Sequence, residues 1–120
     1  MEKVRNFQDL RAWGEARKLA QVIYQVTLSF PKEELYGLTS QIRRAAVSIS
    51  SNIAEGSKRL TTKDLCHFLS IAQGSNEEVK SLLILAQDIG YLDSQHFQEI
   101  FKRCRNVGVL LNGLTRSLRS

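Results

Sequence analysis

The chain contains one proline and no long apolar run, and both features limit the folds that it can adopt. Proline interrupts helix interiors, so its near absence permits long continuous helices. The longest purely apolar run has only a few residues, whereas a transmembrane helix needs about 20. The opening MEKVRNFQDL has neither the apolar core nor the cleavage site of a secretory signal. We therefore expect a cytoplasmic protein with no membrane partner.

Patterns that usually carry catalysis or hold metals are also scarce. The two cysteines lie far apart and form no CxxC pair, so we expect free, partly buried thiols. An aspartate precedes each histidine by three residues, in Asp64-x-x-His67 and Asp93-x-x-His96. Both acids stand at predicted helix starts, where capping is favoured over metal binding. The sequence therefore predicts no catalytic residue, no metal site and no cofactor, and a protein that is not an enzyme.

Apolar residues recur every three or four positions in four segments, which predicts helices at residues 9–29, 38–56, 62–89 and 94–118. No strand pattern is present, and a chain of 120 residues suffices for one core, so residues 1–120 should form a single domain. Long helices with short connections are typical of an all-α, antiparallel, up-down-up-down four-helix bundle.

The predicted helices have recognisable ends and apolar stripes. The expected capping and terminating residues are Asp9, Gly56, Thr61 or Thr62, Gly90, and Asp93 or Ser94. The stripes are Trp13, Ala16, Ala20, Ile23, Thr27 and Phe30; Leu38, Ile42, Ala45, Ile49 and Ile53; Leu65, Phe68, Ala72, Ser75, Val79, Leu82, Ala86 and Ile89; and Phe97, Ile100, Cys104, Val107, Leu111, Leu114 and Leu118. The second helix is rich in small residues, so we expect it at the centre of the bundle.

Further apolar side chains extend these stripes around the helices. Residues 82–85 in the third helix and residues 109–111 in the fourth are apolar in succession, and the first helix adds Leu19, Val22 and Val26. Monomers rarely expose large apolar patches, so a second buried face in a homo-oligomer is the favoured interpretation. The alternative is scattered surface leucines, which are common in monomers.

The net charge of +5 is unevenly distributed: residues 1–32 carry +3, residues 33–63 carry +2, residues 64–98 carry −4 and residues 99–120 carry +4. This pattern suggests either a polyanionic partner or a contact between acidic and basic parts of subunits. The candidate nucleic-acid-binding residues are Arg43, Lys58, Arg59, Lys63, Lys102, Arg103, Arg105, Arg116 and Arg119. A solvated basic surface is the alternative for a monomer.

The second helix also carries a polar stripe. With two residues of the third helix it gives an expected network of Gln41, Arg44, Ser48, Asn52, Glu55, Ser75 and Glu78. If the hairpin turns near residues 57–61, the residue numbers of facing positions sum to about 119. Arg44 then lies near Ser75 and within a long side chain's reach of Glu78, so we predict a contact between Arg44 and Glu78. We favour a structural network that fixes helix register over a ligand site.

Two segments, FPKEELYGLTSQIRRAAVSISSNIAEG (residues 30–56) and FLSIAQGSNEEV (residues 68–79), closely resemble the bacterial four-helix-bundle family encoded in intervening sequences of large-subunit ribosomal RNA genes. The opening FQDLRAWGEARKLA and the closing VLLNGLTRSL fit the same pattern. The resemblance implies a ring-like homopentamer. Asn76 and Glu77 depart from the family pattern, a difference we expect to affect the surface more than the fold.

The resemblance also bears on function. A more distant relative, the accessory variability protein of diversity-generating retroelements, is a basic pentamer that partners a reverse transcriptase and binds nucleic acid. We therefore expect a non-enzymatic homo-oligomer that binds RNA or other nucleic acid non-specifically. The alternative is a structural or adaptor scaffold that recruits a reverse transcriptase or a ribosome-associated protein and has no direct nucleic-acid role.

Overall fold

The structure is a computed structural model that describes residues 6–119. Its α-helices are α1 (Arg11–Val26), α2 (Leu38–Gly56), α3 (Thr62–Asp88) and α4 (Ser94–Arg119). Three short 3-10 helices, η1 (Phe7–Asp9), η2 (Thr27–Ser29) and η3 (Lys32–Glu34), flank α1 and precede α2. The described residues contain no strand, so the fold is all-α, as predicted.

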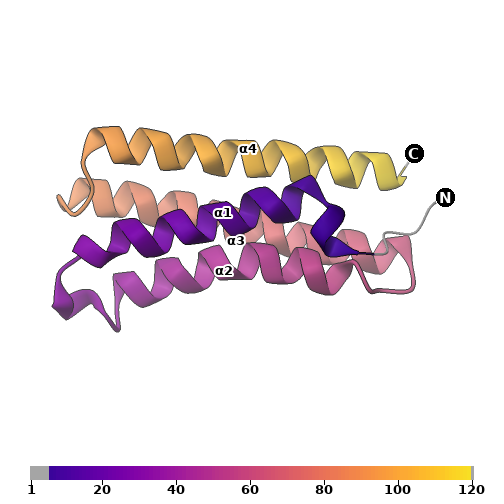
Figure 1. Ribbon diagram of the computed structural model, residues 1–120, viewed down its shortest axis with the longest axis horizontal. Coiled ribbons are helices and arrows are strands. Elements are labelled where there is room, and N and C mark those ends of the chain that lie inside the picture. The colour runs from indigo at the N-terminus through magenta and orange to yellow at the C-terminus, as the bar shows by residue number, and fades with distance from the viewer. Residues whose placement is uncertain (1–5, 120) are drawn as a thin grey trace.

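The four helices run antiparallel along the long axis of a bundle that measures 47 × 24 × 19 Å (Figure 1). α1 and α3 each pack against both α2 and α4. The start of α1, the α2–α3 connection and the end of α4 share one end, which we call the terminal end (Figure 1). The α1–α2 and α3–α4 connections form the opposite, distal end. Within residues 6–119, no helix has the length and apolar character needed to cross a membrane.

α2 packs most extensively against α3 and less extensively against α1. Its predicted stripe is buried at every position: Leu38, Ile42, Ala45, Ile49 and Ile53. Ala46 is also fully buried, so a second side of this helix is closed by its neighbours. The small side chains of α2 thus allow close approach on more than one face. The expected central position is wrong, however, because α2 packs against two neighbours, α1 and α3, as each of the other helices packs against two.

α3 buries two overlapping patterns where one was predicted. Both patterns contain the buried residues Leu65, Ala72, Val79 and Ala86. The predicted pattern adds Phe68, Ser75 and Leu82, whereas Leu69, Asn76 and Leu83 are the fully buried alternatives. The cause is that α3 packs against two helices at once: Ser75 contacts α2, and Asn76 contacts α4.

The expectation that Asn76 belongs to the surface is therefore wrong. Its side chain is fully buried, and Nδ2 donates a hydrogen bond to the backbone carbonyl of Cys104 on α4 at 2.8 Å. Within the described residues Oδ1 has no hydrogen-bond partner. Next to it, Gln73 Nε2 donates to the Gly108 carbonyl at 3.1 Å and to Asn112 Oδ1 at 2.8 Å. Amide side chains therefore join α3 to α4.

The start of α1 differs from the prediction. The helix begins at Arg11, and Asp9 lies in the preceding 3-10 turn instead of capping α1. That turn is capped by Asn6, whose side chain accepts a hydrogen bond from the Gln8 amide at 2.9 Å. Leu19, which we had placed on a second outer face, is fully buried in the core.

The glycine at the end of α2 has a different role from the one predicted. Gly56 is the last helical residue, and the chain leaves the helix through Ser57 in helical geometry, so no left-handed glycine terminates α2. A Cβ at residue 56 would lie 2.7 Å from Cβ of Phe68 and 3.1 Å from Cδ1 of Leu65. Gly56 is therefore needed for the close approach of α3.

The two ends of α3 follow the sequence signals. The Thr61 side chain accepts a hydrogen bond from the Asp64 amide at 3.1 Å and so caps the helix. Gly90 has φ +85°, and the amide of Tyr91 donates to the Ala86 carbonyl at 2.9 Å. This pattern is a Schellman motif, which requires a left-handed residue and therefore favours glycine.

The apolar residues of the runs 82–85 and 109–111 divide into two groups. Leu82 and Leu83 are buried, so they do not form a second face. By contrast, the exposed fractions of Ile84, Leu85 and Val109 are 45%, 46% and 69%. The outer surface of the bundle therefore retains apolar positions, although fewer than the sequence suggested.

Both cysteines, Cys66 and Cys104, are free and buried. Burial raises the pKa of the Cys104 thiol to about 12, so this sulfur stays protonated at neutral pH. Cys104 is accordingly a small core residue.

Candidate functional site

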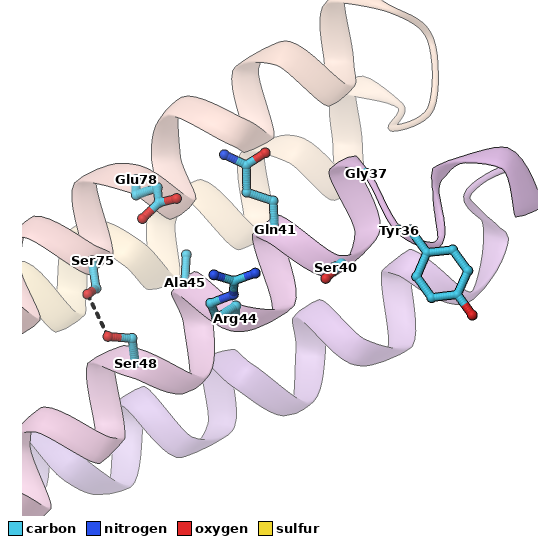
Figure 2. Close-up of a pocket in the computed structure, with 9 residues that line it drawn as sticks. All are labelled: Tyr36, Gly37, Ser40, Gln41, Arg44, Ala45, Ser48, Ser75 and Glu78. Carbon is cyan, nitrogen blue, oxygen red and sulfur yellow. Dashed lines mark hydrogen bonds between the residues drawn. The ribbon is translucent and has the colours of Figure 1, made fainter.

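A depression of about 400 Å³ follows the groove between α2 and α3. It is lined by Tyr36, Gly37, Ser40, Gln41, Arg44, Ala45, Ser48, Ser75 and Glu78 (Figure 2). Arg44 and Glu78 border it from opposite helices, but no salt bridge within 4 Å joins them in the described structure. The predicted contact is thus wrong as an ion pair. Both side chains are exposed, and water solvates exposed charges so well that pairing gains little.

The hydrogen-bonded part of the predicted network is smaller. The hydroxyls of Ser48 and Ser75 are 2.9 Å apart (Figure 2), and Asn52 Nδ2 donates to Ser48 Oγ at 3.0 Å and to the Ser48 carbonyl at 2.8 Å. Glu55 instead lies 3.8 Å from Arg59 at the surface. These hydrogen bonds link α2 to α3, and each polar side chain of the group has a partner within it. The arrangement is that of a structural network.

The register of this helix pair also differs from the estimate. Ser48 faces Ser75, so the residue numbers of facing positions sum to 123 and not to about 119. Side chains tilt toward the N-terminus of their own helix, and in antiparallel neighbours this tilt increases the sum for residues that touch. The shift moves Arg44 away from Ser75 and toward Glu78.

The two Asp-x-x-His motifs behave differently. Asp93 caps α4: its Oδ1 accepts from the His96 amide at 2.8 Å, and the His96 ring Nδ1 lies 2.9 Å from both carboxylate oxygens. Hydrogen bonds from the backbone and ring of His96 lower the pKa of Asp93, and the bond to Asp93 raises the pKa of His96. Asp64 lies in the first turn of α3 and is not its N-cap, since that residue is Thr61, whose side chain accepts from the Asp64 amide. The described residues contain no cluster of three His, Cys, Asp or Glu side chains able to hold a metal.

Five of the nine candidate basic residues gather at the terminal end of the bundle. Lys58 and Arg59 lie in the α2–α3 connection, Lys63 lies in the first turn of α3, and Arg116 and Arg119 lie in the last turn of α4. Arg59 covers the ring of Phe68, with its guanidinium carbon 4.5 Å from the ring centroid. The antiparallel topology therefore unites charges from segments about 50 residues apart in the chain.

The other four candidates lie elsewhere. Arg43 is a structural residue: its Nε donates to Thr27 Oγ1 at 2.9 Å, and its guanidinium covers the Tyr24 ring at 4.7 Å. Lys102, Arg103 and Arg105 are exposed on the first half of α4, away from the terminal end.

The two ends of the bundle differ in charge. At the terminal end, residues 6–12, 55–65 and 113–119 contain six basic and three acidic side chains, a net charge of +3. At the distal end, residues 27–38 and 86–99 contain one basic and five acidic side chains, a net charge of −4. Arg11, which begins α1, adds to the terminal end and was not among the candidates, because only the assembled bundle places it there.

A second cavity, of about 480 Å³, lies at the terminal end between the start of α3 and the end of α4. It is lined by Thr62, Lys63, Cys66, His67, Ser70 and Arg119. Two of the candidate basic residues, Lys63 and Arg119, thus border one cavity from different helices. Cationic and hydroxyl side chains at one place can bind an oxyanion such as phosphate.

The fold and its charged end define a small all-helical bundle with one basic end and no metal cluster among its described residues. The 23S rRNA-intervening sequence protein family matches residues 8–113, and the chain belongs to this family. A solved structure with the same fold is a protein of unknown function from the S23 ribosomal protein family of Bacteroides thetaiotaomicron. It is 20% identical, with a TM-score of 0.78, over 87% of this chain and 97% of that chain. No curated protein matches the chain.

Proposed function

We propose that this protein is a non-enzymatic homo-oligomer that binds RNA through the phosphates of the RNA backbone, using the terminal end of the bundle. The observation that supports the proposal is the gathering of Lys58, Arg59, Lys63, Arg116 and Arg119 at that end. A polyanion that binds there releases its condensed counterions, which is the main source of affinity in non-specific complexes.

The chemistry of the terminal end favours backbone binding over base recognition. Phe68 is an aromatic residue of the α2–α3 hairpin, and the Arg59 guanidinium already covers its ring. A covered ring does not offer a stacking surface for a base. Phosphate contacts position a protein on nucleic acid but carry little sequence information.

Oligomerisation would multiply the effect of each basic end. Half-exposed apolar residues such as Ile84, Leu85 and Val109 favour contact between copies, because a monomer gains nothing from leaving them in water. A pentamer, the assembly that the family resemblance implies, would carry a net charge of about +25 and present five basic ends in a symmetric array. Light scattering tests this step. A mass near that of one chain, 13.6 kDa, would contradict it.

A binding titration with structured RNA at several salt concentrations tests the RNA proposal. We expect affinity to fall steeply as salt rises. Replacing Lys63, Arg116 and Arg119 together with glutamine should reduce the slope of log affinity against log salt by about 2, because up to three phosphate contacts are lost.

The matched control replaces Lys102, Arg103 and Arg105 with glutamine. It removes the same charge from the same protein but from the first half of α4. Its slope should change much less. Equal losses in the two triple variants would show that net charge, and not the terminal end, drives binding. Negligible affinity at low salt would refute the RNA proposal.

A further inference from the structure

We propose that the cavity between the start of α3 and the end of α4 binds a terminal phosphate of an RNA strand, that is, a phosphomonoester at the 5′ or 3′ end. The inference rests on the proposed RNA function and assigns a ligand group to one part of the terminal end. Its basis is the set of side chains that converge there.

The lining residues of α3 follow helical spacing. Lys63, His67 and Ser70 are separated by four and three positions, so they share one face of the helix. Arg119 borders the same cavity from the last turn of α4. An ammonium group, an imidazole, a hydroxyl and a guanidinium therefore face one space of about 480 Å³. All four can donate hydrogen bonds to an anion.

Three of the donors that line this cavity have no partner in the described part of the chain. The side chains of Lys63, Ser70 and Arg119 form no hydrogen bond and no ion pair there, and His67 contacts the ring of Phe68 edge-on. The nearest acid in the chain, Asp64, does not line the cavity. Two cationic side chains therefore share a hollow without a carboxylate partner, and an anion there would gain from both.

A terminal phosphate fits this cavity better than an internal one. A phosphodiester has two free oxygens and one negative charge, whereas a phosphomonoester has three free oxygens and nearly two negative charges at neutral pH. Arg119 can bind two of those oxygens with its planar fork, which leaves a third oxygen for a donor from α3 such as Lys63. The start of α3 adds the positive end of a helix dipole on the same side.

The test compares three oligoribonucleotides of one sequence: one with a 5′-phosphate, one with a 3′-phosphate and one with hydroxyls at both ends. Each carries a fluorophore on an internal base so that its ends stay free, and binding to the full-length protein is followed by anisotropy. At least one phosphorylated oligonucleotide should bind about tenfold tighter than the hydroxyl form, the gain expected for one charge-assisted hydrogen bond. The comparison of the two phosphorylated forms identifies which strand end is bound.

Variants assign the gain to the cavity. In the double variant Lys63→Gln/Arg119→Gln, the advantage of the phosphorylated RNA should disappear. In the matched double variant Lys102→Gln/Arg103→Gln, which removes the same charge away from the cavity, the advantage should remain. Circular dichroism checks that both variants keep their helices.

The outcomes separate this inference from the RNA proposal. Equal, salt-dependent binding of all three oligonucleotides would overturn the terminal-phosphate site and leave the RNA proposal intact. A phosphate advantage that persists in Lys63→Gln/Arg119→Gln would move the site away from this cavity and overturn the assignment. If no oligonucleotide binds at low salt, both fail.

Discussion

At the scale of single residues, Asn76 has the least expected environment in the molecule. It is fully buried, yet only its nitrogen is paired, with the Cys104 carbonyl. A buried amide with only one of its two polar groups hydrogen-bonded adds little to the stability of the fold. A shift of α4 along α3 would break that remaining bond and so cost free energy. Asn76 is thus best understood as a residue that specifies how these helices pair.

The substitution Asn76→Asp tests this environment with almost no change in shape. A carboxylate at residue 76 would be an unpaired buried charge, so we expect the free energy of unfolding to fall by about 3 kcal/mol at pH 7. Burial raises the pKa of such a carboxyl above its unfolded value of about 3.9, so the loss should be smaller at pH 4, where the native carboxyl is neutral and the unfolded one is only about half ionised. Urea unfolding at the two pH values measures both effects.

The matched control is Asn112→Asp, the same chemical change at an exposed residue of the same helix pair. Asn112 already accepts a hydrogen bond from Gln73, and a carboxylate accepts it equally well. Its stability should change by less than about 0.5 kcal/mol. Equal losses at residues 76 and 112 would contradict the buried position of Asn76.

The sequence could not reveal Asn76, because two helical patterns fit α3 equally well. Both contain Leu65, Ala72, Val79 and Ala86. Because residue 76 is polar, the sequence favours the pattern that does not contain it. A helix that packs against two neighbours buries both patterns, which single-stripe reasoning does not anticipate. The same ambiguity at Leu19 misplaced that residue on an outer face of α1.

At the scale of helices, glycine at the end of α2 sets the distance to α3. We expect Gly56→Ala to lower the free energy of unfolding by about 1–3 kcal/mol, because the new Cβ would lie 2.7 Å from Cβ of Phe68 and must push the helices apart. Gly74→Ala is the control, since a Cβ there meets no atom within 4 Å. In this mid-helix position alanine should raise the stability by about 0.5–1 kcal/mol. Thermal unfolding of the two variants measures the opposite signs, and a stabilised Gly56→Ala would contradict the close packing.

Helix ends were predictable where the capping group lies next to the end in sequence. Thr61 and Gly90 act through bonds that span only a few residues, so their types and spacing were sufficient. The role of Gly56 depends on a residue of the next helix, Phe68, and was therefore not visible. The basic end also depends on residues that are distant in sequence. Residue type is enough to identify the candidates, but only the antiparallel fold shows that Lys63 and Arg119 lie together at one end and that Arg43 does not.

At the scale of the whole molecule, charge is segregated along the long axis of the bundle. The terminal end is basic and the distal end acidic, with some acids already engaged: Glu34 accepts hydrogen bonds from the Leu38 amide at 3.1 Å and from the Tyr91 hydroxyl at 3.0 Å. The latter bond raises the pKa of Tyr91. A polyanion would therefore approach the terminal end and avoid the distal end, which orients any bound RNA relative to the assembly.

The side of the bundle, and not its ends, should carry the contacts between copies. Val109 is the most exposed large apolar residue within a described α-helix, since Tyr36, Leu60 and Leu28 lie in connections or short turns. Val109→Asp should therefore shift the mass measured by light scattering toward 13.6 kDa without loss of helical circular dichroism. Asn106→Asp places the same carboxylate three residues earlier on α4, at an exposed polar position, and should leave the mass unchanged. If the assembly tolerates Val109→Asp as well as it tolerates Asn106→Asp, this face of α4 is open to solvent and copies must meet through another side of the bundle.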